Sequence, residues 1–179
     1  MRVAAPSGKP HAAARTEQII LFRISGQPFA VSSASVQEVR SVDSLAGVAI
    51  GIDLPTLRKV RHVLRRGEKV LYVVSGTAHF GLPASPAGLV FVLRKTQTAL
   101  LVDGIDKMAT MSRLQALPLA YCQEERNWYR GLTALDQNVI PVVNPEGFLN
   151  AEEIALLEAS LVPEAVADEL PGEGMELPE

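Results

Sequence analysis

The sequence predicts an all-β protein that consists of two small β-units in tandem. A strand-turn-strand pattern over residues 19–31 returns about 70 residues later, over residues 89–102. In each unit an Arg-Gly pair and a five-residue apolar strand follow this pattern. These pairs and strands are Arg66-Gly67 with 70–74 and Arg130-Gly131 with 139–143. Short apolar runs separated by Gly, Pro and Ser favour barrels or a sandwich over a βαβ fold.

The first hairpin is predicted from the alternation of its side chains. Strongly apolar residues stand at every second position from Ile20 to Ile24, which is the period of a strand with one buried face. Ser25-Gly26 then predicts a tight turn, and residues 27–32 predict the returning strand. Residues 35–39 are interpreted as a single turn.

Further apolar runs predict the other strands, and clusters of Gly and Pro predict the loops between them. The strands are expected at 69–74, 89–94, 97–102, 130–135 and 138–143, and the loops at 47–53, 76, 81–86 and 117–125. Pro141 has no N–H to donate, so its strand should lie at a sheet edge or carry a bulge. Residues 54–64 have near-helical apolar spacing, but the tandem pattern favours a strand over 60–65.

Charge is distributed unevenly along the chain. The net charge is −3, yet nine of the 20 acidic residues fall in the last 29 positions, which contain no Lys or Arg. We expect a basic, disordered leader over residues 1–16 without the apolar core of a secretion signal, and a disordered acidic tail over 162–179. Residues 151–161 predict a helix with Asn150 as its N-cap.

A series of short motifs resembles the CheW-like domain of bacterial chemotaxis coupling proteins. The motifs are Phe29-Ala30-Val31, Val36-Gln37-Glu38-Val39, Arg66-Gly67, Leu100-Leu101-Val102-Asp103-Gly104-Ile105, Gly131-Leu132-Thr133-Ala134-Leu135-Asp136 and the stretch from Val139 to Glu146. Each motif alone is common, and their order and spacing from Glu17 to Leu149 carry the resemblance. It implies two five-stranded SH3-like barrels packed on a shared core over 17–150, with about 17–87 and 88–150 as interleaved halves.

The resemblance also implies a function. Members of this family are non-catalytic cytoplasmic adaptors that link the cytoplasmic tip of a methyl-accepting chemoreceptor to the regulatory domain of a CheA-type histidine kinase. The family's usual Pro-Val-(Val/Ile)-Asp-Leu-Arg is absent here, because Val70 to Gly76 is Val-Leu-Tyr-Val-Val-Ser-Gly, and Asn144 replaces a common aspartate. These departures keep a second interpretation open, namely a regulatory or sequestering module that no longer assembles receptor–kinase arrays.

Seven residues are predicted to bind partners. They are Val36, Glu38, Val39, Arg66, Val102, Ile105 and Arg130. The resemblance implies that the four apolar residues line a groove for a receptor helix, with burial in the core as the alternative. Glu38 stands between apolar neighbours and must project outward or be paired. The two arginines occupy matching places in the repeat and suit bidentate bridges to a partner's carboxylate, with a role in their own hairpins as the alternative.

A basic cluster over residues 58–69, around the first Arg-Gly pair, has three interpretations. Its six cations are Arg58, Lys59, Arg61, Arg65, Arg66 and Lys69. The cluster is a solvated face, a docking patch for an acidic protein, or a patch for nucleic acid. The low aromatic content of 5% argues against nucleic acid, which single-strand binders hold by stacking. The acidic tail could instead mask the cluster.

No catalytic or cofactor motif stands in the sequence. It contains no G-x-S-x-G, Walker loop, G-x-G-x-x-G or H-E-x-x-H, and the lone Cys122 makes a disulfide framework or a zinc site improbable. No apolar run approaches the roughly 18 residues of a membrane helix. We therefore expect no enzyme activity, no cofactor, no metal, no nucleic-acid partner and no direct membrane insertion.

Overall fold

The computed structural model describes residues 16–161 of the chain. It divides into two compact units, of which the first ends at Phe148 and the second begins at Leu149. The predicted acidic tail over 162–179, and the leader over 1–16 except for its last residue, lie outside the described residues.

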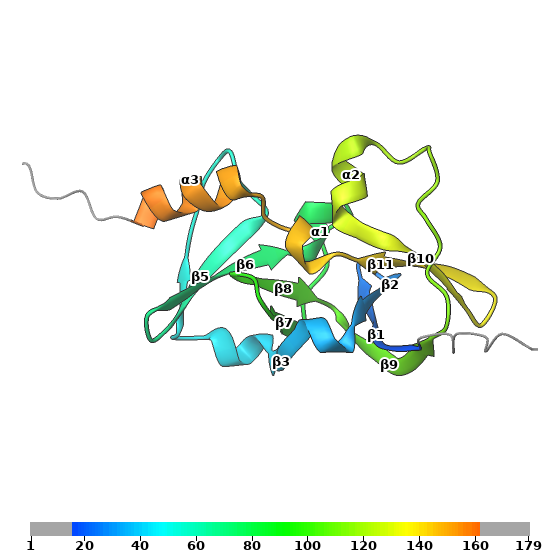
Figure 1. The fold of residues 1–179 in the computed structure, drawn as a ribbon. Helices are drawn as coiled ribbons and strands as arrows, with labels where there is room; N and C mark the ends of the chain where they lie inside the picture. Colours follow the sequence, from blue (N-terminus) through cyan, green and yellow to red (C-terminus); the bar gives the residue numbers. More distant parts are fainter. Residues whose placement is uncertain (1–15, 162–179) are drawn as a thin grey trace, which may run out of the picture. The chain divides into compact units, whose positions relative to one another are not determined.

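The first unit holds two sheets, which we call sheet A and sheet B (Figure 1). Sheet A has the spatial order β10 (Tyr129–Leu135), β11 (Asn138–Val143), β2 (Gln27–Ser32), β1 (Glu17–Ile24) and β9 (Gly104–Met111). Sheet B has the order β3 (Val36–Ser41), β7 (Leu89–Leu93), β8 (Thr98–Val102), β6 (Lys69–Ser75), β5 (Val60–Arg66) and β4 (Ala49–Gly51).

The two sheets have the same strand arrangement. Each sheet contains strands from before and from after residue 87 of the chain. In sheet A the hairpin β1–β2 is flanked by β9 and by the hairpin β10–β11. In sheet B the hairpin β7–β8 is flanked in the same way by β3 and by the hairpin β5–β6. Each central hairpin joins its neighbour through a parallel pair, β11 with β2 and β6 with β8. The predicted repeat is therefore visible as a repeated topology in which the central hairpins are exchanged.

The expectation of two closed five-stranded barrels is not confirmed. In the described part of the chain each sheet has two end strands that no ladder joins, and sheet B has six strands because residues 49–51 form a short β4. In sheet A an isolated bridge between Gln115 and Leu132 connects the segment after β9 to β10, so this sheet curls without closing.

Short helices make the protein mostly β rather than all-β. The helix α1 (Gly76–Phe80) begins at the predicted loop position 76, and α2 (Gln123–Trp128) begins within the predicted loop 117–125 and extends beyond it. Their caps explain them: the Ser75 hydroxyl accepts from the Ala78 N–H, and Cys122 forms a capping box with Glu125. Three 3₁₀ turns complete the first unit, namely η1 (Ser33–Ser35), η2 (Val42–Leu45) and η3 (Pro145–Gly147).

Most predicted strands are confirmed, including the strand over 60–65, and three local predictions are wrong. Residues 36–39 belong to strand β3 rather than to a turn, because they pair with β7 after the 3₁₀ turn η1. The strand of Pro141 lies between β10 and β2, not at an edge, and the register shift of its pairing with β10 falls between Tyr129 and Gly131 rather than at Pro141. Strand β11 pairs with β2 only at Val142, opposite Ala30. The missing N–H of Pro141 therefore breaks no hydrogen bond to β2.

The third correction concerns the two Arg-Gly pairs, which are not equivalent in space. Arg66 ends β5 and precedes the turn to β6, whereas Arg130 stands at the beginning of β10. The turn of the matching β10–β11 hairpin is formed by Asp136 and Gln137, both with positive φ.

Buried side chains on both faces of the strands hold the sheets together. On β1, Ile19 and Leu21 belong to a cluster within sheet A, whereas Phe22 contacts Phe91 of sheet B with ring centroids 5.2 Å apart. Sheet B has its own cluster, which includes Leu71, Val73, Val90 and Val92. Because both faces of the central strands are buried, their sequences are almost continuously apolar.

The second unit contains helix α3 (Ala151–Leu161), as predicted. The Asn150 Oδ1 accepts from the Glu153 N–H at 2.8 Å, and a Glu153 carboxylate oxygen accepts from the Asn150 N–H at 2.9 Å. This reciprocal pair is a capping box, so the predicted N-cap is confirmed.

Candidate functional site

Glu38 is the centre of a charged group on strand β3. Its carboxylate accepts a hydrogen bond from Arg40 Nε on the same strand, and its other oxygen lies 2.9 Å from a guanidinium nitrogen of Arg66. The hydrogen bond from Arg40 holds the pKa of Glu38 below its ordinary value, partial desolvation opposes this effect, and Arg66 adds to it. Glu38 is thus paired within the chain, one of the two outcomes that its apolar neighbours predicted.

The pair between Glu38 and Arg66 joins strands that are far apart in sheet B. The order of this sheet places β3 at one end and β5 beyond three intervening strands. A contact of 2.9 Å across that order requires the sheet to curl on itself. Arg40, which the sequence reasoning missed, completes the group, and the side chains of both arginines remain about one-third exposed, at 35% and 38%.

The four apolar candidates fall into two classes. Val36 is 8% exposed and Val102 is 1% exposed, so both lie in the core. Val39 on β3 and Ile105 on β9 are each 40% exposed. Partner binding at these four residues stays a prediction, and only Val39 and Ile105 offer apolar surface for it.

Arg130 lies apart from the Glu38 group. Two of its guanidinium nitrogens donate to the two carboxylate oxygens of Glu17 on β1, at 2.8 and 3.1 Å. These hydrogen bonds are the main cause that lowers the pKa of Glu17. The acidic residues near Arg130 in sequence, Glu124 and Glu125, are not its partners. A bidentate pair of this kind fixes the start of β10 against β1.

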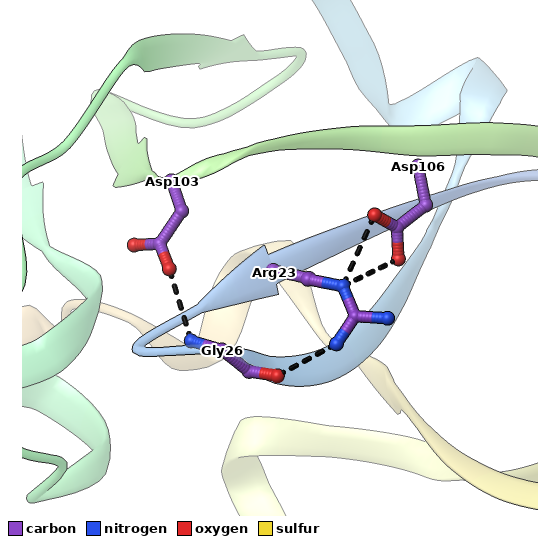
Figure 2. A network of polar contacts seen from close by, with 4 residues as sticks. All are labelled: Arg23, Gly26, Asp103 and Asp106. Atoms are coloured by element: carbon purple, nitrogen blue, oxygen red, sulfur yellow. Dashed lines mark hydrogen bonds and ion pairs between the residues drawn. The ribbon is translucent and has the colours of Figure 1, made fainter.

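Asp103 ties the first hairpin to the end of β8. One carboxylate oxygen accepts from the Gly26 N–H at 3.0 Å, and the other accepts from the Ser85 hydroxyl at 2.8 Å. Burial by itself raises the pKa of Asp103, but these hydrogen bonds outweigh it and the pKa is lowered. Figure 2 shows the hydrogen bond from the Gly26 N–H to Asp103 beside the ion pair between Arg23 and Asp106. Asp103 thus stabilises a turn 77 residues earlier in the chain.

A hollow of about 370 Å³ opens beside this hairpin on sheet A. Apolar side chains, including Leu21, Leu135 and Ile140, form part of its lining. Two ion pairs, Arg23 with Asp106 and Lys107 with Asp136, also line it. No sequence pattern predicts this hollow, because its lining comes from the five strands of sheet A and a turn, which are distant in the chain.

His79 packs among aromatic rings, and Cys122 caps a helix. The His79 ring contacts Phe80, Trp128 and Phe148 with centroids 4.6 to 5.0 Å apart, and burial lowers the pKa of His79 to about 3. Cys122 is exposed and caps α2. Trp128 also contacts Phe80 and Tyr129 in the same aromatic cluster.

Within residues 16–161 no group of three or more His, Cys, Asp or Glu side chains is placed to hold a metal ion. The same residues include no helix that is long and apolar enough to cross a membrane.

The family follows from a match to a known domain. Residues 18–153 match the model of the CheW-like domain, which is most of the chain. The chain belongs to the CheW-like domain family. Members of this family are chemotaxis adaptors, or scaffolds, which are generally non-catalytic.

Individual relatives agree with this membership. A protein of Rhizobium etli described as a probable chemotaxis protein CheW is 27% identical over 144 residues, which cover 76% of this chain and 89% of that protein. The crystal structure of the scaffolding protein TtCheW from Thermoanaerobacter tengcongensis superimposes with a TM-score of 0.63 and 14% identity. The match covers 78% of this chain and 97% of that one. The second likeness supports the CheW fold.

Within this CheW-like chain, the strand that departs from the family's usual motif is an interior strand. Residues Val70 to Ser75 are in β6, which lies between β5 and β8, and Leu71 to Ser75 are buried. Gly76 follows, and a Cβ there would stand 2.7 Å from both Ile24 Cδ1 and the Leu101 carbonyl oxygen. The close approach of these atoms explains why a glycine occupies this position.

Proposed function

We propose that this CheW-like protein is a non-catalytic cytoplasmic adaptor that couples chemoreceptors to a CheA-type histidine kinase. The observation that carries the proposal is the family match over residues 18–153. One partner is the cytoplasmic tip of a methyl-accepting receptor, and the other is the regulatory domain of the kinase. Nothing in the described part of the chain favours the alternative of a regulatory or sequestering module.

The receptor contact is assigned to the exposed apolar residues. A helical receptor tip needs an apolar surface with a polar rim. Val39 and Ile105 provide exposed apolar area, and the buried Val36 anchors the strand that carries Val39. The Glu38 group lies beside Val39 on β3 and supplies the polar rim.

The kinase contact is assigned to the arginines. Glu38 fixes the guanidinium of Arg66 through one nitrogen, and the other nitrogens keep donors for a carboxylate of the partner. Arg130 is already engaged on both nitrogens by Glu17, so its contribution is to hold β10 in place.

Co-sedimentation tests this function. The full chain is mixed with membranes that contain the receptor, with and without the kinase from the same organism. We expect the chain to sediment with the receptor and to increase the amount of kinase that sediments. A Val39→Asp substitution should abolish both effects, whereas Val139→Asp, at an exposed position of β11, should leave them intact. Equal sedimentation of the kinase with and without the chain would refute the proposal.

A further inference from the structure

The basic cluster of the sequence is divided in space. Arg58, Lys59 and Arg61 stand at the beginning of β5, where the Ser75 N–H donates to the Lys59 carbonyl at the end of β6. Arg65 and Lys69 stand at the other end of this hairpin, on either side of its turn. Since a strand rises about 3.3 Å per residue, Arg61 and Arg65 are about 13 Å apart along β5.

The fold adds two more cations to the turn end. Strands β6 and β8 are parallel, with Tyr72 opposite Thr98, and Figure 1 shows their arrows pointing the same way. Both strands therefore begin at one end of sheet B, and the turn before β8 lies beside the first residues of β6. The Tyr72 N–H donates to the Gln97 carbonyl at 2.7 Å, which ties this turn to β6. The turn carries Arg94 and Lys95.

We call Arg65, Lys69, Arg94 and Lys95 the basic end of sheet B. All four are exposed, and none of their side chains forms a hydrogen bond or an ion pair with another residue of the described chain. Strand spacing and rise place them within about 10 to 15 Å of one another. An extended peptide of about five residues spans this distance, so one partner segment can contact all four side chains. The acidic residue of the β5–β6 turn is Glu68.

The side chains around the basic end favour an acidic polypeptide over nucleic acid or a membrane. Neither turn contains an aromatic side chain on which a base could stack. No exposed large apolar side chain lies in either turn to enter a membrane. Guanidinium and ammonium groups without aromatic or apolar neighbours suit the carboxylates of a flexible acidic peptide, which can adjust their positions to the four cations. We propose that the basic end of sheet B binds an acidic polypeptide segment of a partner protein, a contact beyond the proposed receptor and kinase surfaces.

The test measures binding of a labelled peptide of alternating glutamate and serine to the full chain at low salt, by fluorescence anisotropy. The variant pairs Arg65→Gln with Lys69→Gln, and Arg94→Gln with Lys95→Asn, remove two charges each. Asparagine tolerates the positive φ of Lys95. Each pair should raise the Kd by roughly 3- to 10-fold, as expected for loss of two exposed ion pairs. Glu68→Gln should lower the Kd.

The matched control is the pair Arg58→Gln with Arg61→Gln, which removes the same charge from exposed positions at the other end of the hairpin. It should change the Kd by less than about 2-fold. Equal weakening by the control pair would show that only net charge matters and would overturn the assignment. Tighter binding of a single-stranded oligonucleotide than of the peptide would also overturn it. Because the assay contains neither receptor nor kinase, its failure leaves the proposed function untouched.

Discussion

Individual polar residues in this protein hold distant strands in position. Glu38, Asp103 and Glu17 each accept hydrogen bonds from a segment that is remote in the chain or in the sheet order. Each has a lowered pKa because hydrogen bonds favour its charged form. Their charged forms therefore add stability above the ordinary carboxyl pKa, and this contribution is lost as the pH falls through the lowered values.

Asp103 and Asp106 provide a matched comparison at this scale (Figure 2). Asp103→Ala should lower the free energy of unfolding by about 1 kcal/mol, because the Gly26 N–H and the Ser85 hydroxyl lose their acceptor. Asp106→Ala removes only the exposed ion pair with Arg23 and should cost below about 0.5 kcal/mol. Urea unfolding of both variants measures the difference, and an equal loss would contradict the role given to Asp103.

His79 predicts a dependence of stability on pH. Burial, aided by the charge of Lys59, lowers its pKa to about 3 from an ordinary 6.5, so the unfolded chain binds a proton that the folded chain excludes. Stability from this group is complete above pH 6.5 and falls toward pH 3, by at most about 1.4 kcal/mol per pH unit. His79→Leu should remove this part of the slope in unfolding measured from pH 7 to pH 4.5. A slope unchanged by the substitution would show that His79 is protonated in the folded protein.

Strand β3 carries both a core residue and the proposed receptor contact. Val36 is buried and pairs with Leu93 of β7, whereas Val39, three residues later, is 40% exposed. A register shift between Val36 and Glu38 changes the alternation of the strand. This shift also explains why the sequence pattern indicates a turn over 35–39, since a bulge disturbs the period of two.

The two valines predict opposite effects. Val36→Ala should destabilise the protein by about 2 kcal/mol through loss of buried apolar area, and binding by the folded protein should be retained. Val39→Ala should leave thermal unfolding nearly unchanged and weaken receptor binding. Thermal denaturation and receptor co-sedimentation of both variants test this. A stable Val36→Ala protein would contradict the burial assigned to Val36.

The sequence predicted elements better than the contacts between them. Strong period-two patterns and the turns Ser25-Gly26 and Gly67-Glu68 define β1, β2, β5 and β6. The helices α1 and α2 were missed because they are short and depend on caps, not on apolar periodicity. The Glu38–Arg66 contact was beyond prediction, since it depends on how sheet B curls. The sequence nevertheless indicates both residues separately, Glu38 as a charge between apolar neighbours and Arg66 by its place in the repeat.

At the scale of the molecule, exchange of the central hairpins makes the two parts of the chain interdependent. Each sheet combines strands from before and after residue 87, so neither part contains a complete sheet. Fragments 17–87 and 88–150 should each be unfolded alone, and an equimolar mixture should recover β structure. Circular dichroism of the fragments and of the mixture measures this. Cooperative unfolding of either isolated fragment would contradict the interdependence.

The central proposal is that this CheW-like protein binds a CheA-type kinase through Arg66, whose guanidinium is held in place by Glu38. A calorimetric titration of the full chain with the isolated kinase regulatory domain tests it most directly. We expect saturable micromolar binding that Glu38→Ala and Arg66→Ala weaken, while Arg61→Ala, an exposed arginine on the same strand, leaves it unchanged. The absence of saturable binding by the folded chain would contradict the claim.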